Sequence, residues 1–180
     1  MADGGDRGPI LLAIARDAIA SSQGSPRVWG EPWLAELAAT FVTLRDEMGE
    51  LRGCIGTIDP HRSLGDDVWH NAIAAAYRDP RFPPLDAREI GSTSVEVSVL
   101  TPRVPFAVGS EAEAVDRLAP GADGLVLEYL QHRATFLPQV WENISDPLDF
   151  LCELRRKAGL PARFWHPDVK LSRYGVEKHR

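Results

Sequence analysis

The chain has 180 residues, and its 26 Asp and Glu residues outnumber its 20 Lys and Arg residues, which gives a formal net charge of −6. Because nucleic-acid binding relies on a concentrated basic surface, this balance argues against a nucleic-acid partner. The longest strongly apolar stretch, residues 10–20, contains Arg16 and Asp17 and is about half as long as a membrane span, so we expect a cytoplasmic protein without a membrane segment.

The length and the 44% content of hydrophobic residues suit one globular domain, which we expect to cover residues 1–180. The Gly- and Asp-rich residues 1–7 are predicted to be disordered. Cys54 and Cys152 are the only cysteines. Two cysteines indicate reduced thiols instead of a disulfide framework, and the pattern around Cys152 is that of a small core residue on a helix.

Hydrophobic periodicity and capping residues predict the elements of the first half of the chain. In chain order we expect a helix over 9–22 followed by Gly24, a loop over 25–32, strands over 41–46 and 51–58 with a turn at 48–49, a helix from Ser63 to near Asp79, and a stiff proline-rich loop at 81–84. Trp29 and Trp33 are expected to cover an edge of the core.

The second half is predicted in the same way. We expect a strand over 93–101, a short helix from Ser110 to Leu118, a hairpin of 125–130 and 133–137 turning near 131–132, a short helix over 138–144, and a helix over 147–158 capped by Asp146 and ended by Gly159. Glu96 is expected on a solvated strand face, or beside an arginine if that face is covered. Strands mixed with helices, without regular strand-helix-strand alternation, predict an α+β fold with a mainly antiparallel sheet, hairpins and flanking helices.

One stretch has unusual local chemistry: LRGCIG, residues 51–56, puts Cys54 between two glycines inside a predicted strand. Alternate side chains share a face of a strand, so Arg52 and Cys54 are expected to project together, roughly 7 Å apart. A nearby guanidinium stabilises a thiolate, which is the form of cysteine that acts as a nucleophile or ligand. Arg52 and Cys54 are therefore candidate catalytic residues, and Gly53 and Gly56 are candidates for leaving the thiol approachable. The alternative is a packed cysteine whose neighbouring glycines let another backbone come close.

A thiol nucleophile also needs a base, and the chain offers five histidines: His61, His70, His132, His166 and His179. The sequence assigns none of them to Cys54. We predict no metal site, because the chain contains no C-x-x-C, no H-E-x-x-H and no close His pair, and no cofactor is indicated. Further binding candidates are Arg81 and Phe82 in the proline-rich loop, and Gln139 and Trp141 after Pro138.

The hexapeptide and its following residue resemble the hallmark of the AMMECR domain family. Other segments resemble that family in the same order, namely residues 79–85, 97–101, 134–141 and 157–160. The resemblance extends over most of the chain. The bacterial and archaeal members of this family are similar to what is called AmmeMemoRadiSam system protein A. The resemblance implies an α+β domain with two lobes about a cleft, associated with a Memo-like protein and a radical SAM protein. It implies no established activity, and it carries a functional role only onto Arg52, Gly53, Cys54 and Gly56.

Three hypotheses about function follow. In the first, a cleft site centred on Cys54 and Arg52 serves thiol-dependent chemistry or ligand binding alongside the two partner proteins. In the second, the domain is a non-catalytic interaction module, with a docking surface around Arg81 and Trp141. The third, an RNA-binding or RNA-modifying domain, is disfavoured by the acidic charge.

Overall fold

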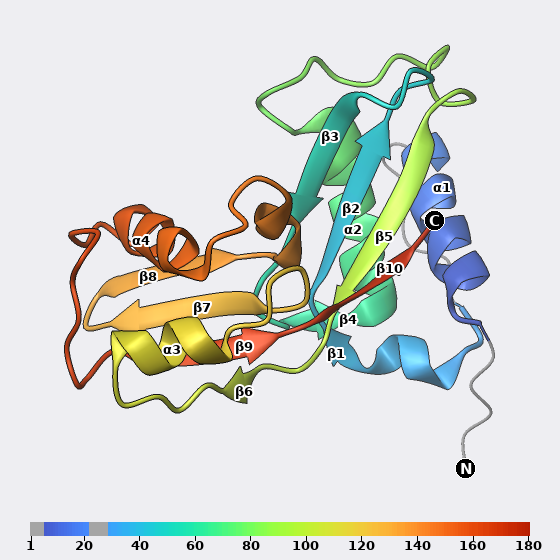
Figure 1. Cartoon of the computed structure of the whole chain (residues 1–180). Coiled ribbons are helices and arrows are strands. Elements are labelled where there is room, and N and C mark those ends of the chain that lie inside the picture. Colours follow the sequence, from blue (N-terminus) through green and yellow to red (C-terminus); the bar gives the residue numbers. More distant parts are fainter. Residues whose placement is uncertain (1–5, 22–28) are drawn as a thin grey trace. The chain divides into compact units, whose positions relative to one another are not determined.

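The computed structural model describes residues 6–21 and 29–180 (Figure 1). The chain forms two compact units, one of residues 1–100 with 177–180 and one of residues 101–176. Most of the predicted N-terminal disorder, together with Gly24 and residues 25–28, lies outside the described residues. Asp6 and Arg7 are described: the Asp6 carboxylate accepts a hydrogen bond from the Gly8 N–H, and the Arg7 guanidinium lies 4.8 Å from the ring centroid of Trp33.

The helices and strands are arranged as an α+β fold, as predicted. The helices are α1 (Gly8–Ser21), α2 (Leu64–Tyr77), α3 (Glu111–Arg117) and α4 (Pro147–Lys157), with 3₁₀ turns η1 (Pro32–Ala35) and η2 (Pro138–Glu142). The strands are β1 (Leu37–Ala38), β2 (Thr40–Arg45), β3 (Leu51–Gly56), β4 (Arg62–Ser63), β5 (Ser94–Leu100), β6 (Val104–Pro105), β7 (Gly124–Tyr129), β8 (His132–Phe136), β9 (Lys170–Tyr174) and β10 (Val176–His179). No helix among the described residues has the length and apolar character needed to cross a membrane.

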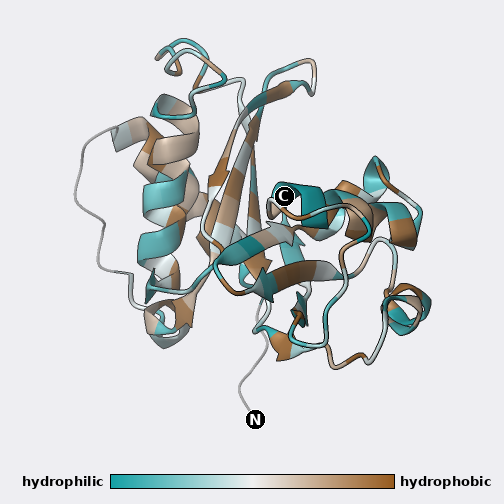
Figure 2. Cartoon of the chain, turned by 90° about the vertical axis from the view of Figure 1, so that its left-hand side faces the viewer, coloured by the Kyte–Doolittle hydropathy of each residue, from teal (hydrophilic) through white to brown (hydrophobic). Residues whose placement is uncertain are grey.

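The first unit is built on a four-stranded sheet of order β10-β5-β2-β3, and a short β1-β4 ribbon accompanies it. Helices α1 and α2 lie together on one face of this sheet (Figures 1 and 2). Leu11, Ile14 and Val68 from the helices and Val42 and Val97 from the strands are completely buried in the shared core. In Figure 2 these strands are largely brown and the helices alternate between teal and brown, as expected for a helical layer with one apolar face.

The capping residues of the first unit behave as predicted. The Ser63 hydroxyl accepts a hydrogen bond from the Asp66 N–H and starts α2, and Gly49 adopts a φ of +82° in the β2–β3 turn. Trp29 and Trp33 pack partly buried against the core, as predicted. The face of β5 that bears Ser94, Glu96 and Ser98 is less solvated than predicted. Ser98 is 1% exposed, and Glu96 pairs with Arg180 at 2.5 Å, so this face follows the covered alternative.

A buried carboxylate joins the parts of this unit around the end of β3. Asp67 on α2 is completely buried, and its Oδ2 accepts hydrogen bonds from the backbone and hydroxyl of Thr40, the hydroxyl of Thr57 and the side chain of Asn71. The other oxygen lies 3.1 Å from the Arg62 guanidinium. Because a buried charge needs such partners, Asp67 fixes the start of β2 and the exit of β3 against α2.

The second unit holds a four-stranded antiparallel sheet of order β6-β9-β7-β8, with α3 and α4. The β7–β8 turn consists of Leu130 and Gln131, one residue earlier than predicted, and Leu130 has a φ of +50°. Helix α4 begins and ends as predicted, since the Asp146 side chain accepts from two backbone N–H groups and Gly159 has a φ of +77°. Cys152 is only half-buried, because Phe150, Leu151 and Leu154 occupy the buried stripe.

Candidate functional site

The hexapeptide forms β3, which ends the strand order of the first sheet and pairs with β2. In the antiparallel register, Cys54 lies opposite Thr43 and Gly53 lies opposite Leu44. The position of a β-carbon built on Gly53 points at Ala75 of α2, so alternation directs Arg52 and Cys54 to the other face of the strand. The predicted strand and its alternation are therefore confirmed.

The Cys54 thiol is half-buried and has a hydroxyl neighbour across the hairpin. The Thr43 hydroxyl donates to Cys54 Sγ at 3.4 Å. Both cysteines of the chain are free thiols, as predicted. The hydrogen bond from Thr43 ties the sulfur to the neighbouring strand β2.

The loop after α2 covers the free edge of β3 at Cys54. The Cys54 N–H donates to Asp79 Oδ2 at 2.9 Å, and Arg81 Nη2 donates to the Cys54 carbonyl oxygen at 2.9 Å. Unpaired backbone groups at a sheet edge invite the addition of another strand. Asp79 and Arg81 occupy both of these groups and so fix the backbone that carries the thiol.

Asp79 and Arg81 are themselves a bidentate pair, with Nε to Oδ1 at 2.9 Å and Nη2 to Oδ2 at 2.7 Å. The Asp79 side chain is only 1% exposed, whereas that of Arg81 is 53% exposed. The hydrogen bonds from Arg81, supported by the N–H of Cys54, hold the pKa of Asp79 well below its ordinary range. The hydrogen bond to Asp79 raises the pKa of Arg81, and an interaction with the Cys54 side chain acts in the same direction. Arg81 is thus the guanidinium that is bound at the Cys54 backbone.

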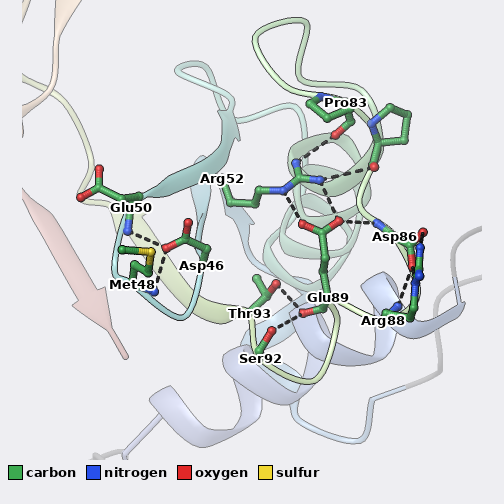
Figure 3. A network of polar contacts seen from close by, with 11 residues as sticks. Asp46, Met48, Glu50, Arg52, Pro83, Asp86, Arg88, Glu89, Ser92 and Thr93 are labelled. Carbon is green, nitrogen blue, oxygen red and sulfur yellow. Dashed lines mark hydrogen bonds and ion pairs between the residues drawn. The ribbon is translucent and has the colours of Figure 1, made fainter.

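Arg52, the cation expected beside the thiol, is committed to other groups. Its Nε and Nη2 donate to the two carboxylate oxygens of Glu89 at 2.9 and 3.1 Å, and Nη1 donates to the Pro83 carbonyl oxygen at 2.9 Å (Figure 3). The hydrogen bond to Glu89 raises the pKa of Arg52. The expected pairing of Arg52 with Cys54 is therefore corrected: the two residues share a strand, but the guanidinium is used to bind the 83–89 loop.

Close packing explains why the hexapeptide has glycine at both positions. A β-carbon on Gly53 would lie 2.2 Å from the carbonyl oxygen of Ala75, and one on Gly56 would lie 2.2 Å from the ring of Phe41. Distances below 3 Å are not tolerated by real β-carbons, so both positions require glycine for packing. The Phe41 ring occupies the space beside Gly56, which corrects the expectation that this glycine leaves the thiol approachable.

The other candidate residues are divided between the two units. Arg81 and Phe82 belong to the first unit, and Gln139 and Trp141 belong to the second. Trp141 is 5% exposed, its ring stacks on Phe150 at 3.8 Å, and its Nε1 donates to the Asp123 carbonyl oxygen. A residue used this way in a core cannot supply an exposed docking surface, so that expectation for Trp141 is corrected. Gln139 is half-buried on η2, where its Oε1 is buried without a hydrogen-bond partner among the described residues.

Among the described residues, no histidine is hydrogen-bonded to Cys54. Within residues 6–21 and 29–180, the bonds formed by Cys54 are those to Thr43, Asp79 and Arg81. The rings of His61 and His70 bind the backbone carbonyl oxygens of nearby aspartates. Across the same described residues, no group of three or more His, Cys, Asp or Glu side chains is placed to hold a metal ion.

Comparison with known proteins places this site in a family. The family profile AMMECR1 matches residues 12–179, almost the whole chain. The chain belongs to the AMMECR1 family. The similarity read from the hexapeptide and the later segments is therefore confirmed.

Relatives of this AMMECR1 chain cover nearly its full length. A protein from Methanothermobacter thermautotrophicus is 40% identical over 96% of this chain and 93% of its own length, and a protein from Thermofilum pendens is 38% identical over 96% and 88%. Among solved structures, the crystal structure of the uncharacterised protein PH0010 from Pyrococcus horikoshii is similar, with a TM-score of 0.82 and 35% identity over 95% of this chain and 89% of that one.

The candidate site contains three residues that sequence reasoning did not select: Thr43, Asp79 and Glu89. Thr43 and Glu89 carry no local sequence signal, since their roles depend on strand register and on the path of a loop. Asp79 did carry one. An aspartate two residues before an arginine, at the point where a proline ends a helix, is placed to form the Asp79–Arg81 pair.

Proposed function

We propose that Cys54 is a reactive thiol, with Arg81 as the cation that stabilises its thiolate, in thiol-dependent chemistry or in the binding of a ligand that the thiolate contacts. The observation that carries this proposal is the position of Arg81, which Asp79 holds against the backbone of Cys54, with Nη2 donating to the Cys54 carbonyl oxygen at 2.9 Å. A guanidinium beside a cysteine favours the thiolate, which is the nucleophilic form.

Two further features support this role. Arg81 is half-exposed while Asp79 is buried, so the guanidinium is anchored on one side and open to a ligand on the other. The Thr43 hydroxyl supplies a hydrogen bond to the same sulfur. An anionic or electrophilic ligand suits this combination of a cation and a thiolate.

The test is the alkylation rate of Cys54 by iodoacetamide at neutral pH, in which the thiolate forms a carbon–sulfur bond and iodide leaves. A Cys152→Ser background removes the second thiol. We expect Arg81→Gln to slow alkylation several-fold and Arg81→Lys to slow it less, since the lysine keeps the charge but not the bidentate pairing with Asp79. Arg88→Gln is the matched control, because Arg88 is 90% exposed and pairs with Asp86. An Arg81→Gln protein that is folded and reacts as fast as the parent would refute the proposal.

The family resemblance supports a proposal about partners: this domain acts alongside a Memo-like protein and a radical SAM protein. The measurement is co-purification of the three proteins from one organism. A complex that forms equally well with the wild-type protein and with Cys54→Ser would show that the thiol is not needed for assembly, which fits a chemical role for it. Purified components that do not associate in any combination would contradict this part of the proposal.

The steric roles of Gly53 and Gly56 favour a second candidate, a non-catalytic interaction module. In this reading the glycines and Cys54 serve packing, and the half-exposed Arg81 contacts a partner protein. We then expect partner binding to survive Cys54→Ser and to be lost in Arg81→Ala. Loss of binding in Cys54→Ser with full binding in Arg81→Ala would exclude this candidate.

A further inference from the structure

We propose that Arg52 is a positioning residue, which places Arg81 at Cys54 by binding the loop that carries Arg81. The inference rests on the proposed function at Cys54 and assigns the conspicuous arginine of the hexapeptide a task different from thiolate stabilisation. The task follows from what the Arg52 guanidinium contacts and from where those contacts lie in the chain.

The segment from 78 to 93 joins α2 to β5 without helix or strand. A connection of this length is held in one conformation only by contacts of its own. One such contact is local to the helix end: the Leu85 N–H donates to the Ala76 carbonyl oxygen, and Leu85 is 5% exposed in the core. Further polar contacts to the body of the unit are made at Cys54, through Asp79 and Arg81, and at Arg52.

Arg52 binds this segment at two separated places. Its side chain, 12% exposed, donates to the carbonyl oxygens of Pro83 and Pro84 and forms the bidentate pair with Glu89. Proline has no N–H, so a proline-rich loop offers carbonyl oxygens as its main polar contacts. Arginine suits this arrangement because its planar guanidinium presents several donors at fixed angles, which a lysine cannot reproduce.

Glu89 also holds together the part of the loop that follows the prolines (Figure 3). Its carboxylate accepts the N–H of Asp86, and its carbonyl oxygen accepts the hydroxyl groups of Ser92 and Thr93. The Arg52–Glu89 pair therefore connects β3 to the whole 83–93 stretch, and the Asp79–Arg81 pair connects the preceding residues to Cys54 on the same strand. Two anchors only two strand residues apart fix one loop, so loosening the first is expected to move Arg81 away from the second.

The experiment compares Glu89→Gln and Arg52→Lys with the control Arg88→Gln, all with Cys152→Ser. Glu89→Gln keeps the shape of the side chain but turns an NH₂ group toward the guanidinium in place of an accepting oxygen. The first readout is hydrogen exchange of the Cys54 and Arg81 amides, which both donate to Asp79. The second is the iodoacetamide rate of Cys54.

We expect both amides to exchange about tenfold faster in Glu89→Gln and Arg52→Lys, with alkylation slowed toward the Arg81→Gln rate, and no change in Arg88→Gln. Unchanged amide exchange in folded variants would overturn the inference. Faster exchange with an unchanged alkylation rate would also overturn it, provided that Arg81→Gln does slow alkylation. If Arg81→Gln itself leaves alkylation unchanged while exchange rises in the two variants, the proposed function fails and the positioning role of Arg52 stands.

Discussion

Gly53 of strand β3 packs directly on Ala75 of helix α2, because a β-carbon added to Gly53 would lie 2.2 Å from the Ala75 carbonyl oxygen. The atom that would be struck belongs to the backbone of the last turn of α2, which cannot rotate away as a side chain can. This contact sets how closely the edge strand approaches the helix that precedes the Asp79–Arg81 loop.

We predict that Gly53→Ala destabilises the protein by about 3 kcal/mol, because the added methyl group must displace the strand or the helix. The free energy of unfolding in urea measures this change. Gly91→Ala is the matched control, since a β-carbon at Gly91 has no heavy atom within 4 Å, and we expect it to be nearly neutral. Equal stability of the two variants would contradict the close packing of β3 on α2.

The low pKa of the Asp79 carboxylate predicts that the folded protein loses stability in acid. Its pKa is far below the ordinary value of 3.8, mainly through the hydrogen bonds from Arg81. The unfolded chain therefore binds more protons than the folded one as the pH falls below about 4, so the stability due to Asp79 is complete above that pH and decreases with further acidification.

The measurement is urea unfolding of wild type and Asp79→Asn at neutral pH and between pH 4 and 2.5. We expect Asp79→Asn to lose about 1–3 kcal/mol at neutral pH, because the Cys54 N–H and Arg81 lose a charged acceptor. The gap between the two proteins should narrow as the pH falls. Glu47→Gln, which removes a carboxylate from the exposed β2–β3 turn, controls for net charge. A gap that widens in acid would contradict the assigned direction.

The β7–β8 turn offers a stabilising substitution in the second unit. Leu130 has a φ of +50° and is 80% exposed, so it adopts a left-handed conformation without burying its side chain. Asparagine tolerates this conformation better than leucine does. We predict that Leu130→Asn raises the free energy of unfolding by about 0.5–1 kcal/mol, and a decrease in stability would show that Leu130 makes a contact the turn depends on.

Much of the fold could be predicted from the sequence because its signals are local. Ser63, Ser110 and Asp146 cap helices through bonds within three residues, and the valines of β5 alternate with a period of two. Short strands were not predicted. β1, β4 and β6 have two residues each, and β9 and β10 pair with strands far away in the sequence, so their pairing is decided by neighbours that no local pattern specifies.

The sequence alone determined that Cys54 lies in a glycine-flanked strand, shares a face with Arg52 and belongs to the hallmark motif of its family. Only the tertiary structure decided which arginine meets which group. Strand alternation fixes the face on which a side chain lies, but the partner comes from a loop that begins 25 residues later. That loop gives Glu89 to Arg52 and brings Arg81 to Cys54, and its path depends on the packing of Leu85 and on the close approach of Gly53 to Ala75.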